Sequence, residues 1–163
     1  MDSNLNLTIG LKGQLALNAQ AVPLQEGYLK LGGIVDSENQ SDGLSFGVVC
    51  SAPADAPSAI VAGAGTGNVI RGIVAFDDSI AQNALGHPTK YLAGMPCAFI
   101  AKGLVKVQSW QTGKNPVIGY KVQFDDETGE IGFVASTADE DNTLLAGASV
   151  VDVTNDGAYI WLS

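Results

Sequence analysis

The chain has 163 residues, the length of a single domain, and a formal net charge of −9. Arg71 is its sole arginine, so it lacks the clustered Lys and Arg that binding to nucleic acid or to an anionic membrane requires. Hydrophobic residues make up 46% of the chain and the mean hydropathy is +0.19, which is high for a monomer with a wetted surface. We therefore expect part of the apolar area to lie in contacts between subunits or with a partner protein.

The N-terminal part reads as an extended segment. Residues 5–17 alternate apolar and polar side chains, which is the period of a half-buried strand, and Leu5, Leu7, Ile9 and Leu11 would share one face. The run Ala21-Val22-Pro23 separates this segment from the rest, so we expect an N-terminal arm or strand over 1–22 and a β-rich domain over 23–163. An arm with one apolar face must join a sheet, either its own or a neighbour's.

Short β-rich runs dominate the middle of the chain. They predict strands at 28–35, 44–51 and 69–76. The segment 52–68 contains two prolines and ends in a glycine-rich run, so we expect a loop there, and a single helical turn is expected near 79–85. Strands at 97–101 and 104–109 follow, joined by a tight turn at Lys102-Gly103.

The C-terminal part predicts two hairpins. The first pairs 118–124 with 131–135 across a polar connection that contains Gly129. The second pairs 148–153 with 158–162 across Thr154-Asn155-Asp156-Gly157, whose Asn, Asp and Gly tolerate the positive φ of a short turn. Many short strands separated by 20 glycines predict an all-β fold, an antiparallel sandwich or small barrel of jelly-roll-like type with an extended N-terminal strand or arm.

Patterns that could carry catalysis are weak. Gly43-Leu44-Ser45-Phe46-Gly47 matches the GxSxG nucleophile elbow, and Asp77 or Asp78 and then His87 follow in the chain order of an α/β-hydrolase. The elbow needs a turn between a strand and a helix, whereas an apolar strand follows Ser45. The glycine-rich run 63–68 lacks the GK[ST] ending and the helix of a phosphate-binding loop. We expect no enzyme activity, no catalytic residues, no cofactor and no metal site.

The cysteines and aromatic residues favour structural roles. Cys50 and Cys97 each lie in an apolar run without a CxxC neighbour, which is typical of small buried hydrophobic groups, with a disulfide or a metal site as the alternative. Trp110 and Trp161 near strand ends are more typical of core or interface anchors than of sugar platforms. The sequence shows no secretory pattern and no apolar stretch near the roughly 18 residues of a membrane span, so we expect synthesis in a reducing cytoplasm.

Taken in order, several of these segments resemble the structural cement, or head decoration, proteins of tailed bacteriophages. The family has a strand with Gly-Ile-Val, here 72–74, a Y-x-x-G run, here 91–94, and a strand pair around Lys-Gly, here 102–103. Residues 44–49 are similar to its I-x-F-G-x-x-V segment, and Thr128-Gly129 to its TG turn. The resemblance covers residues 41–162 and leaves the first 40 without a clear match.

The resemblance implies a β-rich virion protein, commonly a trimer, that binds the outer surface of the assembled head near local three-fold axes and stabilises it. The major capsid protein and further copies of the chain would be its partners, with no nucleic acid and no membrane, after synthesis in the host cell cytoplasm. The alternative is a tail- or fibre-associated β-domain that binds a host surface glycan through Trp110, Trp161 and Tyr91. The expected partner-contact residues are Leu5, Leu7, Ile9, Leu11, His87 and Tyr91.

Overall fold

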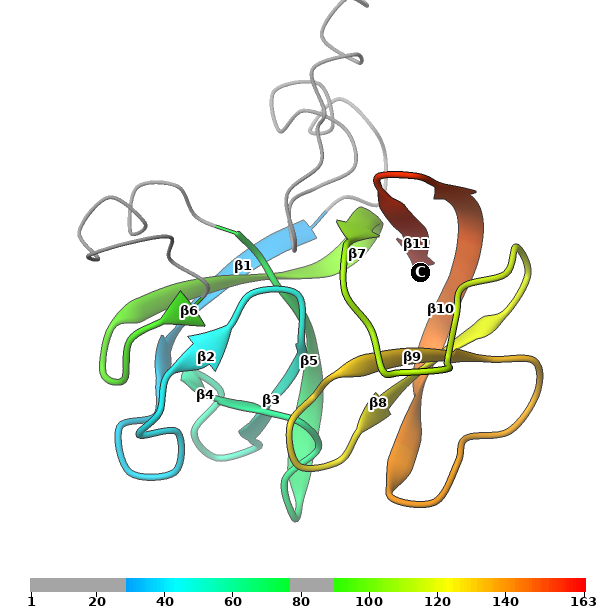
Figure 1. Ribbon diagram of the computed structural model, residues 1–163. Helices are drawn as coiled ribbons and strands as arrows, with labels where there is room; N and C mark the ends of the chain where they lie inside the picture. Colours follow the sequence, from blue (N-terminus) through cyan, green and yellow to red (C-terminus); the bar gives the residue numbers. More distant parts are fainter. Residues whose placement is uncertain (1–28, 77–89) are drawn as a thin grey trace, which may run out of the picture.

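The computed structural model describes residues 29–76 and 90–163, and these ranges form strands and connections without a helix (Figure 1). The strands are β1 (Leu29–Val35), β2 (Leu44–Ser45), β3 (Val49–Pro53), β4 (Ala59–Ala62), β5 (Asn68–Val74), β6 (Lys90–Tyr91), β7 (Pro96–Val107), β8 (Lys121–Asp125), β9 (Ile131–Val134), β10 (Asn142–Thr154) and β11 (Gly157–Leu162). The all-β prediction is confirmed. The predicted arm over 1–22 and the helical turn near 79–85 lie outside the described residues. In the described ranges no helix could span a membrane.

Five strands close into a small barrel. β1 pairs with β4, β4 with β3, β3 with β5, β5 with β7, and β7 returns to β1. These pairs are antiparallel except β1–β4, which is parallel. Buried side chains such as Val35, Ile60 and Phe99 fill the interior, and the small β2–β6 sheet adds Leu44 and Tyr91 to the same cluster. We call this cluster the barrel core.

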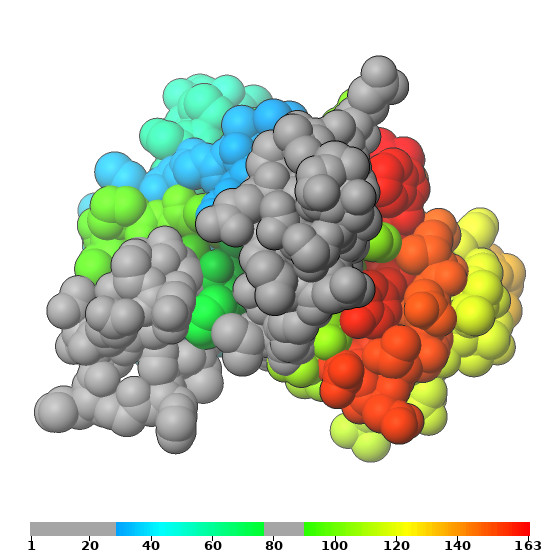
Figure 2. Space-filling view, turned by 90° about the horizontal axis from the view of Figure 1, so that it is seen from above, coloured from blue at the N-terminus to red at the C-terminus, as the bar shows by residue number. Residues whose placement is uncertain are grey.

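A second sheet continues from the barrel. β7 pairs with β11, and β10, β8 and β9 follow in that order. The inner face of this sheet packs against the outside of the barrel, so Val49 and Ile73 from β3 and β5 join Phe124 and Ile160 in a second core. Seen from above, the barrel strands lie on one side and β10 with the segment around residues 120–130 on the other (Figure 2). The described residues therefore form two cores, and β7 contributes to both.

Along the 12 residues of β7, the odd-numbered side chains switch once from one core to the other. Cys97 and Phe99 point into the barrel core, whereas Val105 and Val107, which have the same parity, point into the second core. Side chains alternate strictly along a regular strand, so one extra residue must lie between these two halves. The register with β1 shows it, because consecutive residues Leu29 and Lys30 of β1 pair with Lys102 and Ile100 and skip Ala101.

The predicted turn at Lys102-Gly103 is therefore wrong. The chain does not reverse there; it passes through a bulge and continues from pairing with β1 to pairing with β11, where Gly103 lies opposite Leu162. Gly103 has a φ of 109°, a value that favours glycine. The glycine therefore accommodates the irregular backbone beside the bulge and does not mark a turn. Local sequence does not distinguish a bulge from a tight turn, because the partner strands lie far away in the chain.

Other boundaries were predicted with mixed success. The segment 52–68 is not all loop: β3 extends to Pro53, and Ala59–Ala62 forms β4, which is held by long-range pairing with β1 and β3. The two C-terminal hairpins are confirmed as β8–β9 and β10–β11. β8 starts at Lys121, later than predicted, because Gly119 has a φ of 89° and interrupts the extended backbone.

The connection between β8 and β9 fastens the second sheet to the barrel. Val49 N donates to Gly129 O at 2.9 Å, and Ala64 N donates to Asp126 O at 2.8 Å. Gly129 has a φ of 73°, and a Cβ there would lie 2.3 Å from Val49 O, so only glycine allows this approach. The Asp125 carboxylate accepts hydrogen bonds from the N–H groups of Glu127 and Thr128 and shapes the connection.

Gly72 is predicted to be essential for the packing of β5 against β7. A Cβ at Gly72 would lie 2.2 Å from the main-chain oxygen of Ile100, so Gly72→Ala should destabilise the protein by about 2–4 kcal/mol in urea unfolding. Gly32→Ala is the matched control, because its Cβ would meet Cys97 O at an ordinary 3.5 Å. Equal stabilities of the two variants would contradict this account of the barrel.

The Asp125 connection should make stability depend on pH. The hydrogen bond from Thr128 N, supported by Glu127 N, lowers the pKa of Asp125 below its ordinary 3.8. A carboxylate whose pKa is lower in the folded state than in the unfolded state stabilises the fold at pH values above its unfolded pKa. This stabilisation is lost as the pH falls through the folded pKa. The urea midpoint should thus fall on acidification below about pH 5, and less steeply in Asp125→Asn. Asp55→Asn controls for the lost charge; identical slopes in all three proteins would refute the linkage.

Candidate interaction surfaces

Of the predicted partner-contact residues, Tyr91 alone lies in the described ranges. Leu5, Leu7, Ile9, Leu11 and His87 lie outside the described residues, and their role stays a prediction. Tyr91 is 0% exposed; its Oη donates to Ala75 O at 2.8 Å and its ring meets that of Phe46 edge-on at 5.0 Å. The Tyr91 side chain therefore belongs to the barrel core and is not part of the surface of this chain.

The GxSxG match has no nucleophile-elbow geometry. Ser45 lies on β2 and pairs with Lys90 of β6, and β3 follows it in place of a helix. The glycines on either side, Gly43 and Gly47, have φ values of 88° and 75° and turn the backbone into and out of this short strand. Ser45 is thus an ordinary strand residue, as the hydrophobic run after it indicated.

The two cysteines are buried and free. Burial raises the pKa of the Cys97 thiol to about 11 and raises that of Cys50 further. The reactive form of cysteine is the thiolate, so both thiols are suppressed as nucleophiles at neutral pH. Both side chains pack in the barrel core, which confirms the prediction that they act as small hydrophobic groups.

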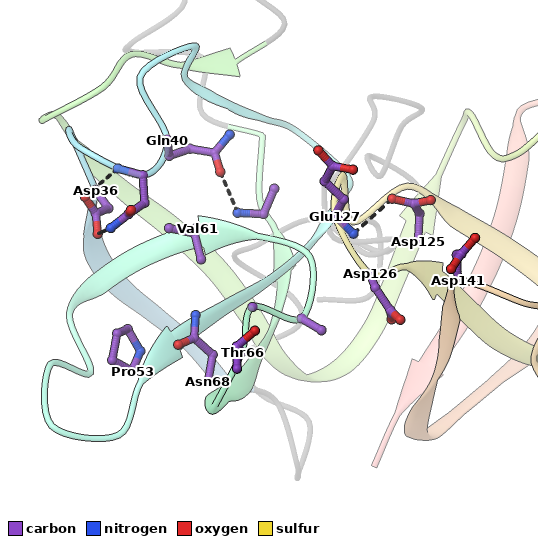
Figure 3. A pocket seen from close by; sticks show the side chains of 14 residues that line it. Asp36, Gln40, Pro53, Val61, Thr66, Asn68, Asp125, Asp126, Glu127 and Asp141 are labelled. Atoms are coloured by element: carbon purple, nitrogen blue, oxygen red, sulfur yellow. Dashed lines mark hydrogen bonds between the residues drawn. The ribbon is translucent and has the colours of Figure 1, made fainter.

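An open groove of about 920 Å³ lies between the connection after β1, the β4–β5 segment and the β8–β9 connection (Figure 3). Asp36, Asp125, Asp126, Glu127 and Asp141 line it. The first three accept hydrogen bonds from neighbouring groups, as in the 2.6 Å bond from Thr143 Oγ1 to Asp126. Within the described ranges no group of three or more His, Cys, Asp or Glu is arranged to hold a metal ion. The acids of this groove thus shape loops and give it a negative charge.

An apolar surface lies where β10 extends beyond β8. Gly119 N donates to Val150 O at 2.8 Å and Val150 N donates to Tyr120 O at 2.9 Å, which sets residues 118–120 antiparallel to β10 and brings Ile118 beside Val151. Ile118 is 63% exposed and Val151 is 44% exposed. Val117 precedes Ile118 in the chain and is 46% exposed, and Val153 lies two residues after Val151 and is 38% exposed. We call Val117, Ile118, Val151 and Val153 the edge patch; clustered exposed aliphatic groups of this kind mark interaction sites.

A second group of apolar and aromatic side chains lies on the outer face of β7 and β11, where Trp161 is 36% exposed and Lys106 is buried. Leu104 is directly opposite Trp161, and Lys106 is directly opposite Tyr159. Their neighbours Val105 and Ile160 point into the second core, so these four side chains point away from it. We call Leu104, Lys106, Tyr159 and Trp161 the outer-face patch.

Sequence reasoning missed both patches. Val117 and Ile118 are adjacent aliphatic residues after Pro116, but the period-two pattern places Ile118 within the predicted strand 118–124 and not at a surface. Trp161 was considered only as a single ring, because its neighbours Leu104 and Lys106 come from a strand more than 50 residues earlier. Only the pairing of β7 with β11 brings them together.

Comparison with known proteins agrees with this picture. A family model described as "Structural cement protein (E217 gp24/Pam3 gp6)" matches residues 2–163. No curated protein is detectably similar in sequence. A chain from the solved structure "The capsid of Myoviridae Phage XM1" has the same fold, with a TM-score of 0.63, 15% identity, and coverage of 98% of this chain and 94% of that one. The buried thiols, the strand-bound serine and the exposed apolar patches suit an assembly protein, and the family match shows that this chain belongs to the structural cement proteins of phages.

Proposed function

We propose that this protein is an accessory cement protein that binds the outer surface of an assembled phage head near local three-fold axes and stabilises it. The observation that carries the proposal is the family match, which spans residues 2–163. The likeness of its fold to a chain from a phage capsid structure supports it. The role is structural and not enzymatic, the partners are the major capsid protein and further copies of this chain, and its place is the capsid exterior after synthesis in the host cytoplasm.

The physics of cementing favours several weak contacts over one strong contact. A trimer that touches neighbouring capsid subunits gains avidity, because one bound copy raises the effective concentration of the others. A ligand that binds only the assembled shell also shifts the equilibrium toward that shell. Three-fold symmetry requires a heterologous interface that closes into a ring, for which exposed strand edges are suitable.

The edge patch is the surface that we assign to the capsid. It is apolar and combines the end of β10, which pairs with β11 along one edge, with the adjacent loop that contains Val117 and Ile118. β10 has β8 as a partner only up to Ser149, so residues 151–154 lack that neighbour and extend past it. Such a surface can add main-chain hydrogen bonds to hydrophobic contact with a shell subunit.

The glycan-binding alternative has less support from the geometry. Tyr91 is buried in the barrel core, and Trp110 packs edge-on against Phe133 at 5.8 Å while its Nε1 donates to Asn115. Of the three proposed rings, Trp161 is the one with substantial exposure. A sugar platform usually needs an open aromatic face, and here a single ring offers it.

Co-sedimentation with expanded heads tests the function. The purified protein should pellet with expanded heads of its phage and raise the temperature at which they rupture. Binding to host cells without any binding to heads would favour the glycan-binding alternative and would contradict the cement proposal.

Substitutions in the edge patch test the assigned surface. Ile118→Asp and Val151→Asp should each weaken head binding at least about tenfold, since a charge replaces buried apolar contact at an interface. Val69→Asp is the matched control: Val69 is 51% exposed but lies on β5, away from the patch. Equal binding by the two patch variants and the control, with unchanged melting temperatures, would exclude this surface while leaving the cement function itself intact.

A further inference from the structure

One cation of the barrel lacks the partners that a buried charge normally has. Arg71 on β5 is the sole arginine of the chain, and its side chain is half-buried. Within residues 29–76 and 90–163, Arg71 Nε is the one buried side-chain nitrogen or oxygen atom without a hydrogen-bond partner. Leaving such a donor unpaired is unfavourable and native structures contain few of them, so the atom points to a missing partner.

The backbone directs this side chain toward the barrel core. Consecutive residues of β3 pair with Ile70 and Gly72 of β5, so Arg71 between them is the extra residue of a bulge. A bulge changes the direction in which the inserted side chain points. The Arg71 guanidinium carbon lies 5.3 Å from the centroid of the Phe99 ring, which is 0% exposed. The ring attracts the positive charge, but it does not supply the oxygen acceptor that Nε lacks.

In the part of the chain that the structure describes, no acid balances this charge. The chain has 17 acids, yet the ion pair found in the described ranges joins Lys114 to Asp139. Burial raises the pKa of the Cys50 thiol, and the nearby charge of Arg71 opposes this rise, which places the guanidinium beside the barrel core. An apolar side chain would cover Phe99 without the unfavourable burial of a charge. Packing alone therefore does not explain an arginine at this position.

The guanidinium group is suited to one class of ligand. Its planar fork of N–H donors fits the two oxygens of a carboxylate. Nη1 and Nη2 of Arg71 are not among the buried unpartnered atoms of the described ranges, and the residue keeps partial exposure, so an oxyanion can approach from solvent. The net charge of −9 repels free anions. A carboxylate on a partner protein is instead held at the site by the other contacts of the interface.

We propose that Arg71 is an anion-binding residue that pairs with a carboxylate side chain of a capsid subunit. This inference rests on the proposed cement function and adds a charged contact to the apolar contact assigned to the edge patch. The unpaired guanidinium of the free protein is unfavourable, and binding to the shell supplies its missing acceptor. Arg71 should therefore matter more for binding than for folding.

The variant Arg71→Met separates binding from folding, because methionine keeps an unbranched side chain over Phe99 and removes the charge. Its urea midpoint should be no lower than that of the parent, whereas its binding to expanded heads in co-sedimentation should weaken at least about tenfold. Lys90→Met is the matched control: it removes an exposed cation whose Nζ already donates to Asp42 O, and it should bind like the parent. Arg71→Lys keeps the charge without the fork and should recover only part of the affinity. Equal head binding by Arg71→Met and Lys90→Met would overturn the proposal.

Small anions test the site without heads. Sodium acetate, compared with sodium chloride at equal ionic strength, should raise the melting temperature of the parent and of Lys90→Met but not of Arg71→Met. The same response to both salts in the parent would overturn an anion site at Arg71. Stabilisation by sodium phosphate that requires Arg71, together with head binding that does not, would assign the site to a free anion and overturn the pairing with the capsid. A parent protein that fails to bind heads would contradict the cement function, while a response to acetate confined to proteins with Arg71 would still support the anion site.

Discussion

The structure depends on one strand that belongs to two cores. β7 pairs with β1 and β5 in the barrel and with β11 in the second sheet, and the bulge at Ala101 turns its inward face from one core to the other. A regular strand could not do this, because its side chains would stay on the same faces along its whole length. The one-residue irregularity therefore allows a small closed barrel and an open sheet to pack as a single unit.

A second connection makes that unit hard to bend. The β8–β9 connection returns to the barrel through main-chain hydrogen bonds from Val49 and Ala64, and Gly129 permits the close approach. The two cores are thus joined both along the backbone of β7 and at the far end of the second sheet. In the proposed role of holding a shell together, this arrangement would let force applied at one surface be carried by strands.

The chemistry of the chain fits a role in assembly. Some of its acids shape connections, as at Asp36 and Asp125, and its sole arginine, Arg71, lies over the ring of Phe99 at 5.3 Å. Its thiols are buried, with their pKa values raised. Two groups of apolar side chains of different character lie on the part of the chain that the structure describes. The edge patch is aliphatic and lies where β10 extends past β8, whereas the outer-face patch contains two aromatic rings and a buried cation.

The sequence by itself determined the class of fold and the family, because both depend on local patterns. Period-two alternation and glycine-rich turns predicted the β8–β9 and β10–β11 hairpins, and the ordered run of segments from Leu44 to Thr128-Gly129 pointed to the cement proteins. Only the tertiary structure decided that Lys102-Gly103 lies beside a bulge, that Ala59–Ala62 is a strand, and that Tyr91 is buried. It also decided which surfaces could bind a partner. Leu104 and Trp161, or Ile118 and Val151, become neighbours only through pairing between segments far apart in the chain, and local propensity carries no information about such pairing.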